Sequence, residues 1–453
     1  FGLTPQSKVW IGAWWIGFVF IALICLLLSL PILAYPSSLP GSEHLQQVKI
    51  SEAHSGNNTK PTRHYSKARE MHKAIFALLR NPTLFFLNLA GASEGLIIAG
   101  FSVFLPKQIE NQFSVTAIAS ALIMGFVTIP SGGGGTYLGG YLVKKFNLTC
   151  SGIIKMCLFS TIIASCFTVC FFISCPNVHF AGLTGPYRNE RQQQQQQHLE
   201  TNTVRTTALN SLPNNNNNYG FESECNSMCK CSRSNYDPIC GTDGIMYFSP
   251  CHAGCFKELN MDSSKVYLDC DCIMPIVNRT EDRGYDAINT MCTTSCNNLW
   301  YFVGLCFFVM FFTFLATMPA LSATLRCVHD EQRSFALGIQ WIIVRIFGTI
   351  PSPMIFGYLI DDSCILWQES CNDSSGACLV YDNSSLSRYM LYIALAAKLC
   401  STIFFFGAWM SYIPPKHIQQ NENRDQSANG MTVAAHEIRV YNNNRSEITN
   451  ALS

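Results

Sequence analysis

The stretch LWYFVGLCFFVMFFTFLATMPALS, from Leu299 to Ser322, contains no charged side chain. An α-helix needs an apolar run of about 20 residues to cross the hydrocarbon core of a bilayer. Ten cysteines come directly before this stretch, between Cys225 and Cys296. Because disulfide bonds persist only in oxidising compartments, we expect the cysteine-rich segment to lie outside the cell or in a lumen. Together, the two features predict a membrane protein with a folded external loop.

The composition of the whole chain agrees with a membrane protein. Of its 453 residues, 48% are hydrophobic and only 13% are charged, against roughly 25% charged residues in soluble domains. The net charge of +1 gives no indication of nucleic-acid binding. Apolar runs with few charges predict seven transmembrane helices, at 11–33, 84–105, 115–143, 151–175, 299–322, 334–360 and 389–412.

Positive charges indicate how the chain is oriented, because cytosolic loops of membrane proteins are enriched in Lys and Arg. The 34–83 segment carries seven of these residues, and the turn after the third predicted span carries Lys144 and Lys145. We therefore expect a multi-pass protein of the plasma membrane. Its C-terminus would lie in the cytosol and its cysteine-rich loop outside the cell.

Low-complexity runs separate the predicted spans from the cysteine-rich module. The glutamines at 192–197 and the asparagines at 214–218 cannot form a core, so they predict disorder. The expected parts are a first span at 1–33, a cytosolic linker at 34–83, three spans at 84–175, a disordered external segment at 176–224, a cysteine-rich external module at 225–298, three spans with a cysteine-containing outer loop at 299–412, and a disordered cytosolic tail at 413–453.

The module has the spacing of a small disulfide-stabilised domain. The run Cys240-Gly241-Thr242-Asp243-Gly244, followed by Tyr247 and Cys251, resembles the core of Kazal-type domains. Such a domain has few apolar residues and relies on cross-links that restrict its unfolded chain. We interpret it as a structural cap rather than a protease inhibitor, and its lack of paired histidines disfavours a zinc site. Without fixing their pairing, we expect disulfides among Cys225, Cys229, Cys231, Cys240, Cys251, Cys255, Cys270, Cys272, Cys292 and Cys296.

The outer loops hold further candidate sites of covalent modification. In the last of them, the short separation favours a disulfide between Cys371 and Cys378, which leaves Cys364 available to the larger loop. The Asn-X-Ser/Thr pattern in predicted outer loops marks three glycosylation sites, which are Asn278, Asn372 and Asn383.

Three ionisable residues fall near the middle of predicted spans: Glu94, Arg345 and Lys398. An ionisable group at that depth costs roughly 3 kcal/mol unless it is paired or faces water. We interpret Arg345 as a substrate contact that binds a carboxylate or sulfate through two hydrogen bonds. The sequence is equally compatible with Lys398 as a substrate contact and as a member of an ion pair. For Glu94, pairing with one of the two cations is favoured over substrate binding.

The N-terminal run Trp10-Ile11-Gly12-Ala13-Trp14-Trp15-Ile16-Gly17-Phe18 fits an aromatic belt at the membrane interface. It also resembles the signature of the organic anion-transporting polypeptides, the solute carrier organic anion family, at Trp10, Gly12, Trp14, Trp15 and Gly17. The chain departs from that signature at Ser7 and Val9, where the family has Asp and Arg. Other segments resemble the same family, among them Leu105-Pro106-Lys107, Gly139-Gly140-Tyr141-Leu142 and Cys364-Ile365-Leu366-Trp367-Gln368.

The resemblance implies an all-α polytopic fold of the major facilitator type, with twelve spans and a Kazal-like loop between the ninth and tenth. On that plan this chain begins at the sixth span and lacks the first five. The resemblance also implies sodium-independent transport of large amphipathic organic anions, such as steroid conjugates, bile acids, thyroid hormones and prostanoids, by alternating access. The alternative is a non-transporting surface protein whose module inhibits proteases or mediates adhesion. No hydrolytic, nucleotide-binding or metal motif stands out, so we expect no enzymatic activity and no cofactor.

Overall fold

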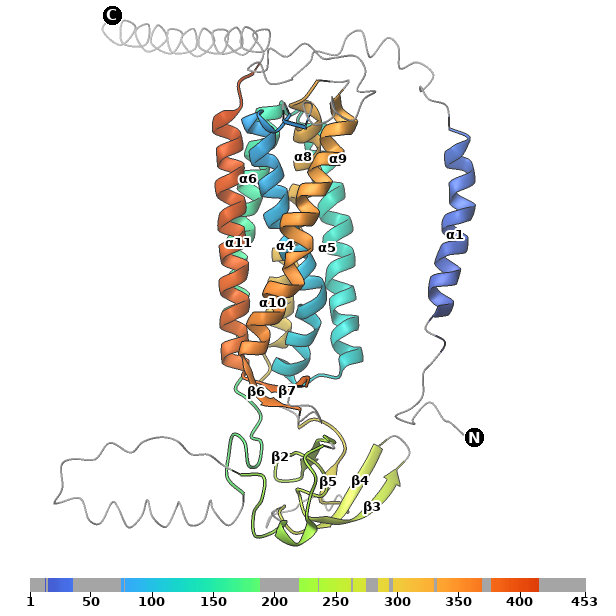
Figure 1. The fold of residues 1–453 in the computed structure, drawn as a ribbon, viewed down its shortest axis with the longest axis vertical. Coiled ribbons are helices and arrows are strands. Elements are labelled where there is room, and N and C mark those ends of the chain that lie inside the picture. Colours follow the sequence, from blue (N-terminus) through green and yellow to red (C-terminus); the bar gives the residue numbers. More distant parts are fainter. Residues whose placement is uncertain are drawn as a thin grey trace, which may run out of the picture. The chain divides into compact units, whose positions relative to one another are not determined.

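The computed structural model describes residues 13, 15–35, 75–76, 78–187, 220–234, 236–261, 264–273, 284–292, 296–329, 332–368 and 376–414. Within these residues, seven helical segments are long and apolar enough to cross a membrane (Figure 1), the number predicted from the sequence. They are α1 (Trp15–Leu33), α4 (Pro82–Phe113), α5 (Ala117–Lys145), α6 (Cys150–Phe167) continued by the 3-10 turn η1 (Thr168–Phe172), α8 (Leu299–Arg326), the broken helix formed by α9 (Arg333–Val344), η4 (Arg345–Thr349) and α10 (Pro351–Asp362), and α11 (Asn383–Ser411).

Helix α1 belongs to the first of two compact units, residues 1–51 and 52–453, and is described by itself. Every residue of α1 is exposed and nearly all are apolar, a pattern suited to a lipid environment. Of the signature residues, Trp15 begins α1 and Gly17 lies in its first turn. The other three, Trp10, Gly12 and Trp14, lie outside the described residues.

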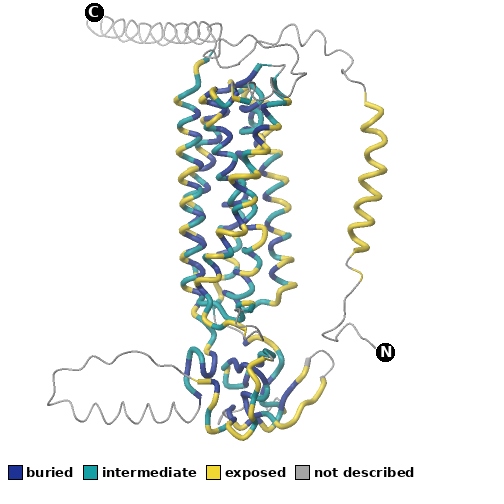
Figure 2. The backbone as a smooth tube through the Cα atoms, viewed as in Figure 1, coloured by how far each residue is buried: buried dark blue, intermediate teal, exposed yellow. Residues whose placement is uncertain are grey.

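The remaining spans pack into one helical bundle in the second unit (Figure 1). Its interior contains two apolar clusters. One is rich in phenylalanine and includes Phe101, Phe171 and Phe302, and the other is mainly aliphatic and includes Ile153 and Ala323. Figure 2 shows that buried and exposed positions alternate along the bundle helices, whereas α1 is exposed throughout. The bundle helices therefore bury one face against each other and leave the other face apolar and uncovered.

Two bundle helices are longer than the apolar runs that predicted them. Helix α4 continues past residue 105 to Phe113, with Lys107 and Glu110 forming an ion pair one turn apart at 3.5 Å. Helix α11 begins before residue 389, because the Asp382 side chain accepts hydrogen bonds from the first backbone N–H groups of the helix. A hydropathy pattern does not detect such polar helix ends, since they extend beyond the apolar stretch.

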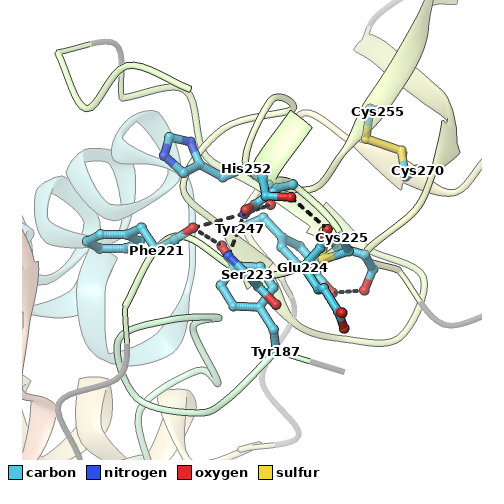
Figure 3. Close-up of a disulfide and its surroundings, with 12 residues drawn as sticks. Tyr187, Phe221, Ser223, Glu224, Cys225, Tyr247, His252, Cys255 and Cys270 are labelled. Carbon is cyan, nitrogen blue, oxygen red and sulfur yellow. Dashed lines mark hydrogen bonds between the residues drawn. A yellow bond between two sulfur atoms is a disulfide. The ribbon is translucent and has the colours of Figure 1, made fainter. Parts of the chain in front are cut away.

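The cysteine-rich module contains a five-stranded antiparallel sheet in the order β2-β1-β5-β4-β3. The strands are β1 (Ile239–Gly241), β2 (Met246–Tyr247), β3 (Cys255–Met261), β4 (Ser264–Cys270) and β5 (Ala287–Ile288). Part of the segment predicted as disordered, 176–224, belongs to this fold, because Tyr187 lies in the core of the module and its hydroxyl donates to the Phe221 carbonyl (Figure 3). The glutamine and asparagine runs and the tail from residue 415 lie outside the described residues.

A buried asparagine fixes the start of the cysteine-rich segment. Asn226 donates from its side-chain amide to the carbonyls of Phe221 and His252, at 2.9 and 3.0 Å, and accepts from the Ser223 N–H at 2.8 Å. His252 forms a further hydrogen bond with Ser249 at 2.8 Å. Burial lowers the pKa of His252 below 6.5, so this ring is held as the neutral imidazole at neutral pH. These contacts tie the start of the cysteine-rich segment, residues 221–226, to residues 249–252 (Figure 3).

The disulfide pairing corrects the predicted set of ten cysteines. Cys296 pairs with Cys175, which the prediction left out, while Cys229 carries a free thiol. The physical reason is geometric: Cys175 and Cys296 stand at the two ends of the loop, and their Cα atoms are 5.9 Å apart, within the range that a disulfide spans. The other pairs of the module are Cys225–Cys272, Cys231–Cys251, Cys240–Cys292 and Cys255–Cys270.

The loop between α10 and α11 forms a hairpin of β6 (Cys364–Trp367) and β7 (Cys378–Tyr381). Cys378 pairs with Cys364, not with Cys371 as predicted, because the two strands bring their Cα atoms to 6.0 Å. Burial argues against the glycosylation predicted at Asn383, since this first residue of α11 is only 4% exposed. The predicted sites at Asn278 and Asn372, like Cys371, lie outside the described residues.

Candidate functional site

The bundle contains a cavity of about 660 Å³ between α4, α8 and the broken helix α9–η4–α10. This volume lies within the range of roughly 300–1,000 Å³ that is typical of pockets for small organic molecules. Its walls are mostly apolar, and its few polar or charged residues include Glu94, Gln340 and Arg345. An apolar cavity with a small number of polar groups is the usual form of a site that binds a small organic molecule.

Close packing of α4 against the broken helix forms one side of the cavity. A Cβ atom at Gly95 would lie 2.9 Å from the Val344 side chain, and one at Gly348 would collide with the Ala92 carbonyl. The Ser352 hydroxyl donates to the Leu96 carbonyl at 2.6 Å. Small residues allow transmembrane helices to approach this closely, so the sequence fixes the broken helix against α4.

Arg345 is the first residue of η4, a π-helical turn in the middle of the predicted 334–360 span. The Ile350 N–H donates to the Arg345 carbonyl at 2.9 Å, which closes the wide turn. Pro351 follows, and it has no N–H with which to continue an α-helix. Single π-turns inside α-helices occur frequently at functional sites.

The charge of Arg345 is open to the cavity. Its side chain is exposed and lines the cavity wall, with the guanidinium carbon 5.9 Å from the centroid of the Trp341 ring. No carboxylate among the described residues forms an ion pair with it. A guanidinium beside an aromatic face can bind an anion through two parallel hydrogen bonds while the ring contacts apolar parts of the same molecule.

Lys398 is held very differently, in a fully buried network. Its Nζ lies 2.6 Å from Glu94 Oε2 and 2.7 Å from Thr313 Oγ1, and the Ser401 hydroxyl donates to Glu94 Oε1 at 2.6 Å. The ion pair weighed for Glu94 and Lys398 is thus confirmed. Lys398 is 0% exposed and does not line the cavity, so the geometry gives no support to it as a substrate contact. Glu94 reaches the cavity wall with its charge already neutralised.

The network lies at one level of the bundle. On α4, α8 and α11, the residues of the two apolar clusters stand on either side of Glu94, Thr313 and Lys398 along the sequence. Three helices therefore place a polar side chain between the same two apolar clusters. The sequence analysis missed Thr313 and Ser401, because hydroxyl residues in a span commonly bond to their own helix.

Two further cavity residues were missed. Trp341 and Gln340 lie on α9 before Arg345. A glutamine within an apolar span is the sequence signal that could have identified Gln340. In the described part of the chain, no group of three or more His, Cys, Asp or Glu residues is arranged to hold a metal ion. The cavity wall itself offers a cation and hydrogen-bonding groups on an apolar surface.

Comparison with known proteins agrees with the resemblance of the sequence. A profile of the Organic Anion Transporter Polypeptide (OATP) family matches residues 1–386. Solute carrier organic anion transporter family member 4A1 of Mus musculus is 41% identical over 420 residues, which cover 91% of this chain and 54% of that protein. Member 4C1 of Homo sapiens is 38% identical over 418 residues, with coverages of 91% and 54%. Member 6A1 of Homo sapiens is 32% identical over 423 residues, with coverages of 92% and 55%.

The chain spans about half the length of these curated relatives. The profile nonetheless covers most of the chain, from the N-terminal tryptophan run through the cysteine-rich module to the start of α11. Apolar helices that cross a membrane and a disulfide-bonded region agree with that match. The chain belongs to the organic anion transporter polypeptide family.

Proposed function

We propose that this protein transports large amphipathic organic anions across the plasma membrane by alternating access, independently of sodium. The observation that carries the proposal is the Arg345 guanidinium, which has no acidic partner among the described residues and lies on the wall of the 660 Å³ apolar cavity. A cation kept unpaired at membrane depth is costly unless it serves a ligand or faces water. The relatives are named as organic anion transporters, which supports a transport role rather than catalysis.

The proposed binding mode follows from the chemistry of the walls. Arg345 binds the sulfate or carboxylate, and the Trp341 ring and the apolar residues of α4 and α8 contact the hydrophobic body. Steroid conjugates, bile acids, thyroid hormones and prostanoids fit this description, since each combines an anionic group with a large apolar skeleton. Glu94 and Lys398 neutralise each other and hold α4 against α11, so the net charge presented to the substrate is that of Arg345.

Access would alternate through movement of the broken helix. The π-turn η4 separates α9 from α10 and carries Arg345 at its start. Discontinuous helices of this kind commonly form the binding sites of transporters near the bilayer midplane. A small conformational change at η4 would move Arg345 together with the cavity wall. Binding of the anion would in this way be linked to opening of the cavity toward either side of the membrane.

The orientation proposed for the protein rests on two chemical features. The disulfide-bonded module is inserted between η1 and α8, and Lys144 and Lys145 lie at the other end of α5 from the η1 side. Disulfides require an oxidising compartment and basic turns favour the cytosol. We therefore place the module outside the cell, as a structural cap, and the C-terminus in the cytosol.

The test is uptake of labelled estrone sulfate and thyroxine into cells that express the complete open reading frame containing this sequence. Saturable uptake in sodium-free medium is expected for the wild type, and it should fall at least tenfold in Arg345→Ala, because that substitution removes the cation. Arg345→Lys keeps the charge but loses the two-pronged geometry, so it should retain part of the uptake.

The matched control is Arg388→Ala, which removes an exposed arginine of α11 that does not line the cavity. At equal surface expression, this variant should keep wild-type uptake. Uptake that survives Arg345→Ala would remove Arg345 from the binding site. If the wild type reaches the surface and takes up no organic anion at all, the transport proposal is wrong.

A further inference from the structure

Among the described residues that line the cavity, Trp341 on α9 carries the accessible aromatic ring. Trp341 is 54% exposed, whereas Phe405, the other aromatic residue of the wall, is 1% exposed. An indole ring offers a large, flat apolar surface of fixed geometry. A molecule in the cavity can therefore pack against Trp341, but it finds almost no accessible surface on Phe405.

Trp341 does not have the usual place of a tryptophan in a membrane protein. Tryptophans are enriched at the ends of spans, where they form the interfacial aromatic belt. Trp15 and Trp300 lie in the first turns of α1 and α8, and Trp409 lies in the last turn of α11, so these three fit a belt. Trp341 lies roughly two helical turns inside the span Arg333–Asp362. An interfacial role therefore does not account for it.

The indole ring and the Arg345 guanidinium form one composite surface. The Arg345 N–H donates to the Trp341 carbonyl, so the two residues stand one helical turn apart on the same face. The guanidinium carbon lies 5.9 Å from the centroid of the indole ring, and both side chains are exposed and line the cavity. Packed aromatic rings have centroids roughly 4.5–7 Å apart. An aromatic ring that packs on the indole therefore lies close enough to bring an attached anionic group to Arg345.

We infer that Trp341 is a specificity-determining residue, which makes the site prefer aryl anions, whose sulfate or carboxylate is attached to an aromatic ring or lies close to one. This inference rests on the transport function proposed above and names the substrate class of the same site. The substrate ring packs on the indole of Trp341 while the anionic group binds to Arg345. Phenolic sulfates fit this arrangement, because a single ester oxygen joins the charge to the ring.

The expected selectivity follows from the physics of aromatic contacts. A pair of aromatic rings is stabilised by more than the area it buries, because the ring quadrupoles favour offset and edge-to-face arrangements. A saturated ring of the same size covers a similar area of the indole without this additional stabilisation. The wild type should therefore bind an aryl sulfate roughly threefold to tenfold more tightly than an alkyl sulfate of the same skeleton and charge.

The probes are estrone sulfate and its analogue with a saturated A ring, 19-norepiandrosterone sulfate. They share the steroid skeleton, the ketone and the position of the sulfate. Each is measured as an inhibitor of labelled estrone sulfate uptake by the complete protein. In Trp341→Leu and Trp341→Met the two inhibition constants should become equal within about twofold, whereas Trp341→Phe should keep part of the preference.

The matched control is Trp300→Leu, which removes a tryptophan that is 70% exposed and does not line the cavity. This variant should keep the full preference for the aryl sulfate. A preference that falls equally in Trp300→Leu and Trp341→Leu would overturn the role of Trp341, because it would not depend on the ring beside Arg345.

A second readout separates this inference from the transport proposal. The same two sulfates are compared by the rise in unfolding temperature that they cause in the purified complete protein, which reports binding without transport. A Trp341-dependent preference in binding without any uptake would overturn transport alone. Equal binding of the two sulfates by the wild type would overturn the role of Trp341 without recourse to any variant, and so would a preference that survives in Trp341→Leu or Trp341→Met.

Discussion

Two cations of the bundle have opposite surroundings. Lys398 is fully buried and its charge is used by Glu94, whereas Arg345 is exposed at the cavity and has no acidic partner among the described residues. The sequence placed all three charges at membrane depth but could not pair them, because the pairing depends on how each helix is rotated about its axis. Only the packed bundle shows that α11 turns Lys398 inward toward α4.

Removing one member of the buried Glu94–Lys398 ion pair should cost far more unfolding free energy than removing one member of an exposed ion pair. Lys398→Met leaves the Glu94 carboxylate buried without its cation, which should cost roughly 3–5 kcal/mol of unfolding free energy. Thermal unfolding of the purified protein measures the loss. The double variant Glu94→Leu with Lys398→Met should recover most of it, since apolar residues often replace a buried ion pair without loss.

The same substitution at an exposed pair is the control. Lys107 and Glu110 lie 3.5 Å apart, and the lysine side chain is 45% exposed. Lys107→Met should cost only about 0–1 kcal/mol, because water already solvates both charges. Equal losses for Lys398→Met and Lys107→Met would show that the buried network does not stabilise the bundle.

Among the helices, α5 contains Pro130 and four consecutive glycines, which disfavour a continuous helix in a soluble protein. The structure shows one continuous helix, Ala117–Lys145. The reason lies in its contact with α8: a Cβ atom at Gly135 would be 2.7 Å from the Phe311 carbonyl oxygen. In a membrane, glycines that break soluble helices instead allow two helices to pack closely. Helix propensity alone therefore does not predict the continuous helix α5, because close packing against α8 stabilises it.

Adjacent glycines near the end of α5 offer a direct test of that packing. A Cβ atom at Gly139 would collide with the Leu315 carbonyl and lie 3.0 Å from Pro319, whereas one at Gly140 meets nothing within 4 Å. Gly139→Ala should lower the unfolding free energy by about 1–3 kcal/mol, because α5 and α8 must separate. Gly140→Ala should leave it unchanged or raise it by up to about 1 kcal/mol, through better helix propensity. Similar unfolding temperatures for the two variants would contradict close packing at Gly139.

For the molecule as a whole, patterns along the chain predicted the number of spans and the disulfide-bonded, cysteine-rich module. They could not predict contacts between distant segments. Cys175 was read as the end of a span, yet it pairs with Cys296 across 121 residues. Gln340 and Trp341 were read as ordinary span residues, and they become cavity residues only when α9 packs against α4. The hydrophobic periodicity and composition of a segment determine whether it forms a helix or a strand. A binding site depends in addition on which helix faces pack against each other.

The proposed orientation and the corrected pairing can be tested together through Cys229. This cysteine carries a free thiol in the module and is partly exposed. If the module lies outside the cell, a membrane-impermeant maleimide should label the protein on intact cells, and Cys229→Ser should lose that labelling. Cys371, which lies outside the described residues, is replaced by serine in both proteins so that it adds no signal.

The outcomes separate the two claims, because orientation and pairing fail in different ways. Labelling only after the cells are permeabilised would place the module in the cytosol, against the proposed orientation. Labelling of intact cells only after reduction would mean that Cys229 is paired, as the sequence first predicted. Free cysteines of the spans, such as Cys25 and Cys400, lie in apolar helices that a charged reagent does not enter, so the signal lost in Cys229→Ser reports on the module alone.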